Sequence, residues 1–249
     1  MRGFDWYPVF FREMLLFKRR FFRLGYFLSA MMVPLIYLIV FGLGLGRDIR
    51  ISSSYSYLGF LIPGLVAMSS MVNSYSWIAN SVNLGRLHFK TFQVLLQAPI
   101  PLFCVVLGEV LSAMVKGLFA GFLVLLAGLL VPSGISLKAP FWIAFVMNCF
   151  LFASLGFVVG MLSKGHEETA TYSNFLILPM AFFCGTFFPL ERIPGFLRPF
   201  VYLMPLTHTN LLIRRTAFDK MALLSWVVLG GYCLLFFSLA LKLTKDYDE

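Results

Sequence analysis

Apolar runs long enough to cross a lipid bilayer recur along this chain, and they contain very few charged side chains. Residues 102–131, for example, include only two, Glu109 and Lys116. Only 12% of the 249 residues are charged, whereas a soluble domain carries about 25%. These features exclude an ordinary soluble enzyme, a disordered chain and a secreted disulfide scaffold. They predict a polytopic membrane protein, because a transmembrane helix needs about 20 apolar residues and about six such helices fit this length.

The predicted fold class is an all-α polytopic membrane protein with six transmembrane helices. Residues 1–23 are aromatic and basic, and their pattern is typical of an amphipathic helix lying in the membrane interface. The transmembrane domain covers residues 24–249, with a cytoplasmic loop at 84–102 and a proline-containing external segment at 189–220. The predicted spans are residues 24–45, 57–82, 103–131, 140–162, 170–188 and 221–243.

The distribution of basic residues predicts the orientation. Six of them precede the first span, and basic residues near span ends favour the cytoplasmic side. Because an even number of spans returns the chain to its starting side, we expect both termini in the cytoplasm. The net charge of +9 is then explained by contact with anionic membrane lipids, and no nucleic-acid partner is expected.

Polar residues inside the second predicted span follow a regular spacing of four and three residues. Ser69, Asn73, Ser76, Asn80 and Asn83 therefore share one helical stripe. The stripe favours either a polar translocation pathway or a dimer interface. The alternative is packing within one chain, where Ser and Asn hydrogen-bond between helices.

The third predicted span contains Glu109 and Lys116, which lie two helical turns apart. At about 10 Å along the axis, they are too distant for a direct ion pair. Lys116 would snorkel to the interface, pair with a carboxylate on another helix, or face a pathway. The two residues motivate an alternative function, an ion- or proton-coupled secondary transporter.

Motifs for catalysis or cofactor binding are missing from the sequence. There is no phosphate-binding loop, and the run that begins at His166 lacks the second histidine of a zinc-binding HExxH motif. The four cysteines lie singly within apolar runs, which is typical of buried thiols. We therefore expect no enzyme activity, no metal and no cofactor in this chain. A membrane scaffold without transport activity is a third alternative.

Three segments resemble the type-2 ABC exporter permeases. The sequence YLGFLIPGL at 57–65 resembles the family's entry to the second span, and GRLHFKTFQVLLQAPIP at 85–101 resembles its first cytoplasmic loop. The sequence LPMAFFCGTFFPLERIPGFLRPFVYLMPLTHTNLLIR at 178–214 matches the family's signature best. In general character, the chain looks most like the bacterial nodulation-type lipo-oligosaccharide and polysaccharide export permeases.

This resemblance implies a function and partners. Such permeases sit in the bacterial inner membrane, dimerise, and bind two copies of a separate ABC ATPase subunit that holds ATP and magnesium. They export a lipid, glycan or amphipathic compound, so the missing phosphate loop is expected. The family contacts its ATPase through the N-terminal helix and the first cytoplasmic loop. The positions implied here are Arg12, Arg19, Arg20, Arg86, Phe89, Lys90, Phe92 and Gln93.

Two further regions acquire roles through the resemblance. The second and fifth spans of the family line the pathway between two copies, which implicates Ser69, Asn73, Ser76, Asn80, Tyr172 and Asn174. The external segment of the family re-enters the membrane as a cap, and its turn would consist of Phe187, Phe188, Pro189 and Leu190. The basic residues of this segment, Arg192, Arg198, Arg214 and Arg215, would face headgroups or an anionic substrate.

Overall fold

The computed structural model describes residues 4–21, 32–45, 50–52, 55–131, 137–215 and 219–248, and most of them are helical. The long helices are α3 (Tyr57–Leu87), α5 (Leu102–Leu129), α6 (Ala139–Leu162), α7 (His166–Phe183) and α10 (Lys220–Asp248). The shorter elements are α1 (Tyr7–Phe21), a π-helical stretch (Leu38–Leu45), β1 (Arg50–Ser52), β2 (Tyr55–Ser56), α4 (Thr91–Leu96), a 3-10 turn (Leu190–Arg192), α8 (Arg198–Leu203) and α9 (Pro205–Ile213).

Among the described residues, four helices are long and apolar enough to cross a membrane: Tyr57–Leu87, Leu102–Leu129, Ala139–Leu162 and Ala222–Tyr247. They coincide with the second, third, fourth and sixth predicted spans. A shorter apolar helix, Met32–Gly42, belongs to the first predicted span, of which residues 24–31 lie outside the described residues. Helix α7 covers most of the fifth, but it begins with His166, Glu167 and Glu168. The count of six spans therefore stays a prediction.

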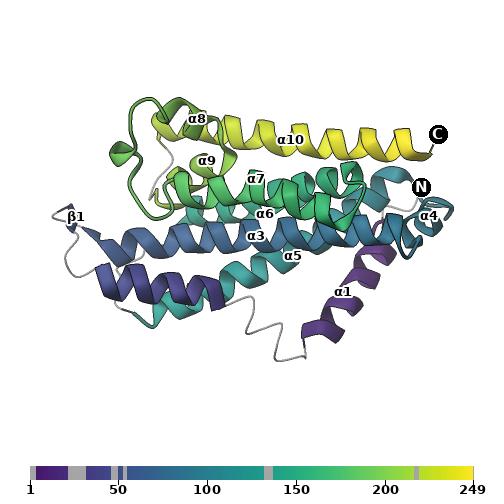
Figure 1. Cartoon of the computed structure of the whole chain (residues 1–249), viewed down its shortest axis with the longest axis horizontal. Coiled ribbons are helices and arrows are strands. Elements are labelled where there is room, and N and C mark those ends of the chain that lie inside the picture. Colours follow the sequence, from purple (N-terminus) through teal and green to yellow (C-terminus); the bar gives the residue numbers. More distant parts are fainter. Residues whose placement is uncertain are drawn as a thin grey trace.

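The helices form an elongated bundle with α3 at its centre (Figure 1). Helix α3 packs most extensively on α5 and α6, and α10 packs on α6. Helix α1 crosses the bundle at one end, where α4 and the C-terminal end of α10 also lie. The β1–β2 hairpin, α8 and α9 lie at the opposite end. Long helices thus join two ends of the bundle that differ in their short elements.

Close packing of α3 against α6 depends on small residues. A Cβ atom added at Gly156 would lie 2.5 Å from the carbonyl oxygen of Tyr75, and one at Gly160 would lie 2.8 Å from that of Ala79. Small residues allow backbones to approach in membrane helix pairs, where van der Waals contact drives association. These two glycines, one turn apart, therefore determine how closely α6 approaches α3.

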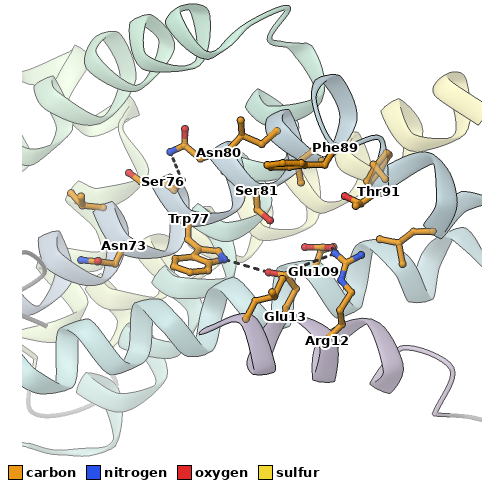
Figure 2. A pocket seen from close by; sticks show the side chains of 17 residues that line it. Arg12, Glu13, Asn73, Ser76, Trp77, Asn80, Ser81, Phe89, Thr91 and Glu109 are labelled. Atoms are coloured by element: carbon orange, nitrogen blue, oxygen red, sulfur yellow. Dashed lines mark hydrogen bonds and ion pairs between the residues drawn. The ribbon is translucent and has the colours of Figure 1, made fainter. Parts of the chain in front are cut away.

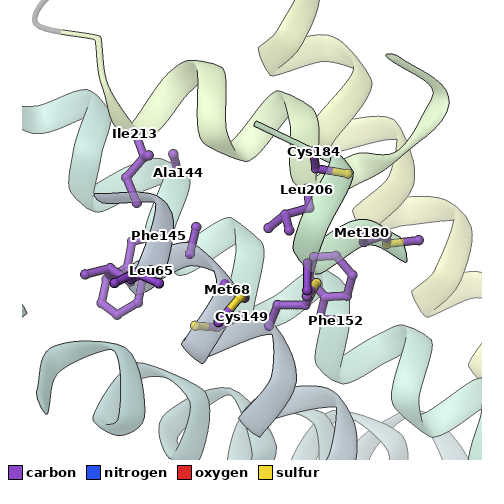
Figure 3. Close-up of a cluster of buried hydrophobic side chains, with 14 of the residues drawn as sticks. Leu65, Met68, Ala144, Phe145, Cys149, Phe152, Met180, Cys184, Leu206 and Ile213 are labelled. Atoms are coloured by element: carbon purple, nitrogen blue, oxygen red, sulfur yellow. The ribbon is translucent and has the colours of Figure 1, made fainter. Parts of the chain in front are cut away.

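The apolar core lies between α3, α6, α7 and α9 (Figure 3). Leu65 of α3 lies beside Phe145 of α6 there, Met68 lies towards Phe152, and α9 contributes Leu206 to the same cluster. Cys149, Cys184 and Cys233 are buried, as predicted, whereas Cys104 is half-buried.

Two local features differ from the predicted layout. The loop that ends the first span contains the antiparallel strands β1 and β2, with Arg50 opposite Ser56, instead of irregular chain alone. The predicted cytoplasmic loop 84–102 is largely helical, because α3 continues to Leu87 and α4 follows at once. At 1.5 Å per residue, α3 is about 46 Å long and exceeds the roughly 30 Å thickness of a bilayer core.

Candidate functional site

A cavity of about 610 Å³ opens between α1, α3, α4 and α5 at the end of the bundle that carries α4 (Figure 2). Its lining combines polar side chains of α3, aromatic rings and charged groups. Asn73, Ser76 and Asn80 come from α3, and Phe89 comes from the turn that follows it. Arg12, Glu13, Trp77 and Glu109 form the opposite wall.

Only the middle part of the predicted polar stripe of α3 lines the cavity. Asn73, Ser76 and Asn80 line the cavity and are half-buried, whereas Ser69 is buried and lies outside the lining. Asn83 is also buried, and its amide donates to the carbonyl oxygen of Ser163 at 3.2 Å. A repeat of 3.5 residues drifts by about 20° per heptad on a straight helix. The ends of the stripe therefore turn towards other helices.

The amide groups in the cavity are oriented by their own helix. Asn73 Nδ2 donates to the carbonyl oxygen of Ser69 at 2.9 Å, and Asn80 Nδ2 donates to that of Ser76 at 2.8 Å. Each bond uses one of the two N–H donors and no acceptor of the side chain. The amide oxygens remain as acceptors beside the cavity.

A network of buried ion pairs joins α1 to α5 in the wall of this cavity. Lys116 Nζ lies 3.1 Å from Glu13 Oε2, and Arg12 Nη2 lies 3.0 Å from Glu13 Oε1. Arg12 also pairs with Glu109 at 2.9 Å. The side chains of Lys116 and Glu13 are 0% and 1% exposed. This network shows that Lys116 pairs with a carboxylate on another helix, which is one of the three predicted environments.

Trp77 completes the network from α3. Its indole nitrogen donates to Glu13 Oε2 at 3.4 Å, and the Lys116 ammonium lies 4.0 Å from the centre of its ring. Burial alone would raise the pKa of Glu13, but the positive charges of Lys116 and Arg12 outweigh it and hold this pKa below its usual range. The stabilisation by Glu13 is therefore present above the usual carboxyl pKa and is lost as pH falls through the lowered value.

Glu13 is a residue of the candidate site that the sequence analysis did not single out. It is the only acidic residue in segment 6–23, and a lone carboxylate among basic residues was the available signal. Periodicity alone could not predict the orientation of α1. That orientation depends on a close approach of α1 to α5 at Gly108, which no sequence period reports. A Cβ atom at Gly108 would lie 2.8 Å from the carbonyl oxygen of Trp6.

The predicted docking residues fall into exposed and buried groups. Phe89 is 71% exposed, and Lys90 is exposed with a left-handed backbone, φ 52°. Phe92, which the resemblance implies as a docking residue, is 3% exposed in the single chain and packs between the rings of Phe157 and Tyr247. The reason is that α4 packs against α3 and α5 and also meets Tyr247 of α10, so that Phe92 points into the bundle.

Polar contacts hold α4 in this position. Gln93 Nε2 donates to the hydroxyl of Tyr247 at 2.8 Å and to the carbonyl oxygen of Arg86 at 2.9 Å. The Arg86 guanidinium donates to the carbonyl oxygen of Ser163. Arg86 and Gln93 thus fix the loop to the bundle, while Arg19 of α1 is exposed. The side chain of Arg20 lies outside what the structure describes.

Substitutions of Phe92 and Phe89 should differ in their effect on the stability of the chain. Phe92→Leu should lower the free energy of unfolding by about 1 kcal/mol, because it removes buried aromatic contacts. Phe89→Leu should leave stability unchanged within about 0.5 kcal/mol, because its ring is exposed. Thermal unfolding of both purified variants in one detergent measures the difference. Equal losses in the two variants would contradict the burial of Phe92.

The segment 189–220, predicted to be external, is tied to the bundle by residues of the PLTHTN sequence at 205–210. Thr209 donates to Asn148 Oδ1 at 2.9 Å, and the amide of Asn148 donates to the carbonyl oxygen of Ala67 at 3.1 Å. Asn210 Nδ2 donates to the carbonyl oxygen of Cys184 at 2.8 Å. The sequence therefore forms a polar connection between α9, α6, α3 and the end of α7.

The four predicted cap residues differ in how far their side chains are exposed. Phe187 is buried and Leu190 is nearly so, while Phe188 is 44% exposed and Pro189 is half-buried. Phe188 and Arg192 line a second cavity of about 590 Å³ beside the end of α7. Arg198 donates to the carbonyl oxygens of Ile193 and Glu191, and Arg215 pairs with Asp219.

Arg214 does not face headgroups, which corrects the prediction. Its guanidinium lies 3.8 Å from the centre of the Phe60 ring, and Nε donates to the carbonyl oxygen of Phe60 at 3.1 Å. It also donates to the carbonyl oxygens of Asn210 and Thr186. Gly64 makes room for it, since a Cβ atom there would lie 2.6 Å from Nη2. Its three acceptors lie in the first turn of α3, in α9 and in the non-helical chain at Thr186, so the guanidinium joins these three parts of the fold.

Tyr172 and Asn174 are not brought to the first cavity. Both are exposed on α7, and neither belongs to the lining of either cavity. The structure thus brings together three of the six predicted pathway residues, Asn73, Ser76 and Asn80.

A bundle of long apolar helices with a partly polar cavity at one end defines a multi-pass membrane protein. The chain belongs to the ABC-2 type transporter family, whose model matches residues 9–218. It is 29% identical over 174 residues to the inner membrane transport permease YadH of Escherichia coli (strain K12), a match covering 70% of this chain and 68% of YadH. It is 30% identical over 219 residues to nodulation protein J of Rhizobium meliloti (strain 1021), covering 85% and 80% of the two chains. The predicted family is confirmed, and the chain is an ABC-2 type transport permease.

Proposed function

We propose that this chain is the transmembrane subunit of an ATP-driven exporter in the bacterial inner membrane, energised by a separate ABC ATPase. The observation that carries the proposal is the family match over residues 9–218. The name of YadH, an inner membrane transport permease, supports the location. The cargo would be a lipid, a glycan or another amphipathic compound. The exporter would take this cargo from the cytoplasm or from the inner leaflet of the membrane.

In the proposed assembly, two copies of this chain bind two copies of the ATPase, which holds ATP and magnesium. The docking surface is formed by α1 and the segment 84–102 on the cytoplasmic side, where both termini also lie. Phe89 and Lys90 support this role because they are exposed. An aromatic side chain that fills a pocket, ringed by polar contacts, is a common source of binding energy at protein interfaces.

The pathway is proposed to form between the two copies, with α3 and α7 as its walls. Polar groups of α3 reach the cavity at Asn73, Ser76 and Asn80. The outer face of α7 carries Tyr172 and Asn174 and is exposed in the single chain. A partner copy would cover this face.

The alternative, an ion- or proton-coupled transporter, is motivated by Glu109 and Lys116. Both residues have ion-pair partners in the structure, Arg12 and Glu13. Their presence within an apolar helix is explained by this pairing and requires no proton pathway. The alternative therefore has no further observation in its favour.

Reconstitution with the ATPase tests the proposed function. The two subunits should purify together, and transport in liposomes should require both of them and ATP. Phe89→Ala combined with Lys90→Glu should weaken the copurification without unfolding the chain. Transport driven by a pH gradient, with no ATPase subunit bound, would contradict the proposal.

Cysteine cross-linking tests the proposed dimer. Asn174→Cys, in a background without the half-buried Cys104, should cross-link two copies, because α7 is proposed to face its counterpart. Val227→Cys is the matched control, since Val227 is 64% exposed on α10 but is proposed to face lipid. Equal cross-linking at both positions would place the interface elsewhere.

A further inference from the structure

We infer that Glu13 is a positioning residue that makes α1 move as one body with α5, so that movement of the docking helix reaches the cavity wall. This inference rests on the proposed function, because it assigns to the ion pairs a part in coupling ATP hydrolysis to transport.

The first argument is the double attachment of α1. Glu13 holds Lys116 through Oε2, and Arg12 holds Glu109 through Nη2. Glu109 and Lys116 lie seven residues apart on α5, which is about 10 Å along its axis. One contact would act as a pivot about which α1 could rotate. Contacts to two different turns of α5 restrict that rotation.

The second argument is that Glu13 joins three helices. Its two oxygens contact Arg12 of α1, Lys116 of α5 and Trp77 of α3. Trp77, Glu13, Arg12 and Glu109 all line the cavity. A displacement of α1 therefore moves a part of the wall beside Asn73 and Ser76 as well.

The third argument concerns energetics. Buried ion pairs seldom add net stability, because the cost of removing two charges from water offsets their attraction. Well-packed apolar residues of the same volume can replace them without loss. Lys116 and Glu13, at 0% and 1% exposure, are therefore a costly way to hold two helices together. What the charges provide is a defined position of α1.

The experiment uses the full complex with the ATPase and separates folding from coupling. Lys116→Met leaves Glu13 buried without its main partner and should destabilise the chain. The pair Glu13→Gln with Lys116→Met removes both charges, so folding and copurification should recover. Transport per ATP hydrolysed should nevertheless stay about tenfold below the wild-type value, a typical size for coupling between sites. Lys116→Arg keeps the charge pair and should retain most of the coupling.

Lys242→Gln is the matched control, because Lys242 is an exposed basic residue of α10, outside both the network and the proposed docking surface. It should leave transport per ATP unchanged. If the neutral pair folds, binds the ATPase and transports as efficiently per ATP as wild type, the ion pairs are only structural and the inference is overturned. If the neutral pair folds but no longer binds the ATPase, Glu13 serves docking, which also overturns it.

Should the neutral pair fail to fold, Glu109→Gln gives the same comparison, because it removes only the second attachment of α1. Reduced transport per ATP would then support the inference, and an unchanged value would overturn it. Failure of the proposed function gives a different result, since the wild-type chain itself would then bind no ATPase.

Discussion

Gly156→Val should prevent α6 from packing against α3 and abolish the yield of folded protein. Even the Cβ atom of the new side chain would lie 2.5 Å from the carbonyl oxygen and 3.0 Å from the Cα atom of Tyr75, and 2.7 Å from Ile78 Cγ2. Two of these three neighbours are backbone atoms of a helix, which cannot rotate away as a side chain can. Overpacking a core costs about 1–3 kcal/mol when side chains can adjust, so the loss here should be larger.

Among the described helices, the contacts of α3 with α6 and with α5 are the most extensive, and α10 and α9 pack on α6 in turn. Separating α3 from α6 therefore disturbs most of the core. Gly231→Val is the matched control, because Gly231 also lies within a long helix and a Cβ atom added there would meet no described atom within 4 Å. The measurement is the fraction of monodisperse protein after purification in detergent. A Gly156→Val yield equal to that of Gly231→Val would contradict the observed packing of α3 on α6.

Much of the bundle could be predicted because long apolar runs report membrane helices directly. The sequence predicts spans at residues 57–82, 103–131 and 140–162, and helices occupy them. The continuation of α3 to Leu87 was missed because Asn83 and Arg86 look like loop residues in sequence. Both are hydrogen-bonded to the carbonyl oxygen of Ser163, a contact across 77 or more residues that no local pattern contains.

The candidate site was predictable where its residues share one helix. The spacing of Asn73, Ser76 and Asn80 places them on one face, and all three line the cavity. Pairing with a carboxylate on another helix was one predicted environment of Lys116, but Glu13 could not be identified as the partner, because this pairing depends on how α1 crosses α5. That crossing is set by close contact at Gly108. A glycine in an apolar run does not by itself indicate which helix will pack against it.

The family signature was recognisable before its physical role was. The prolines of 178–214 predict a broken chain, and short helices are present there. The role of Arg214 followed only from the structure, because its acceptors come from Phe60, Thr186 and Asn210. A basic residue near a membrane surface is usually assigned to headgroups, and this one instead binds backbone carbonyls of the fold.

Arg214→Ala should lower the free energy of unfolding by about 3–5 kcal/mol, because hydrogen bonds from a charged donor each contribute about 1.5–3 kcal/mol and are not fully additive. The substitution leaves three carbonyl oxygens without this donor and removes the cation from the face of Phe60. It also opens space beside Gly64, where the end of the external segment meets α3. Denaturant or thermal unfolding in detergent measures the loss.

Arg215→Ala is the matched control. Arg215 is adjacent in sequence and pairs with Asp219, but both side chains are more than one-third exposed, and such pairs contribute at most about 1 kcal/mol. Equal losses for the two alanine variants would contradict the assigned role of Arg214.

A double-mutant cycle with Gly64→Ala then identifies the contact itself. The Cβ atom that this substitution adds would lie 2.6 Å from Arg214 Nη2 and 2.7 Å from the carbonyl oxygen of Thr186. Each single variant should destabilise the chain. Removing the guanidinium relieves the first of these clashes and leaves the second, so the double variant should lose less than the sum of the two. Additive losses would mean that Gly64 and Arg214 act independently. The segment 57–65, which contains Pro63-Gly64, and the last residue of the signature, Arg214, would then lack the physical link that their packing predicts.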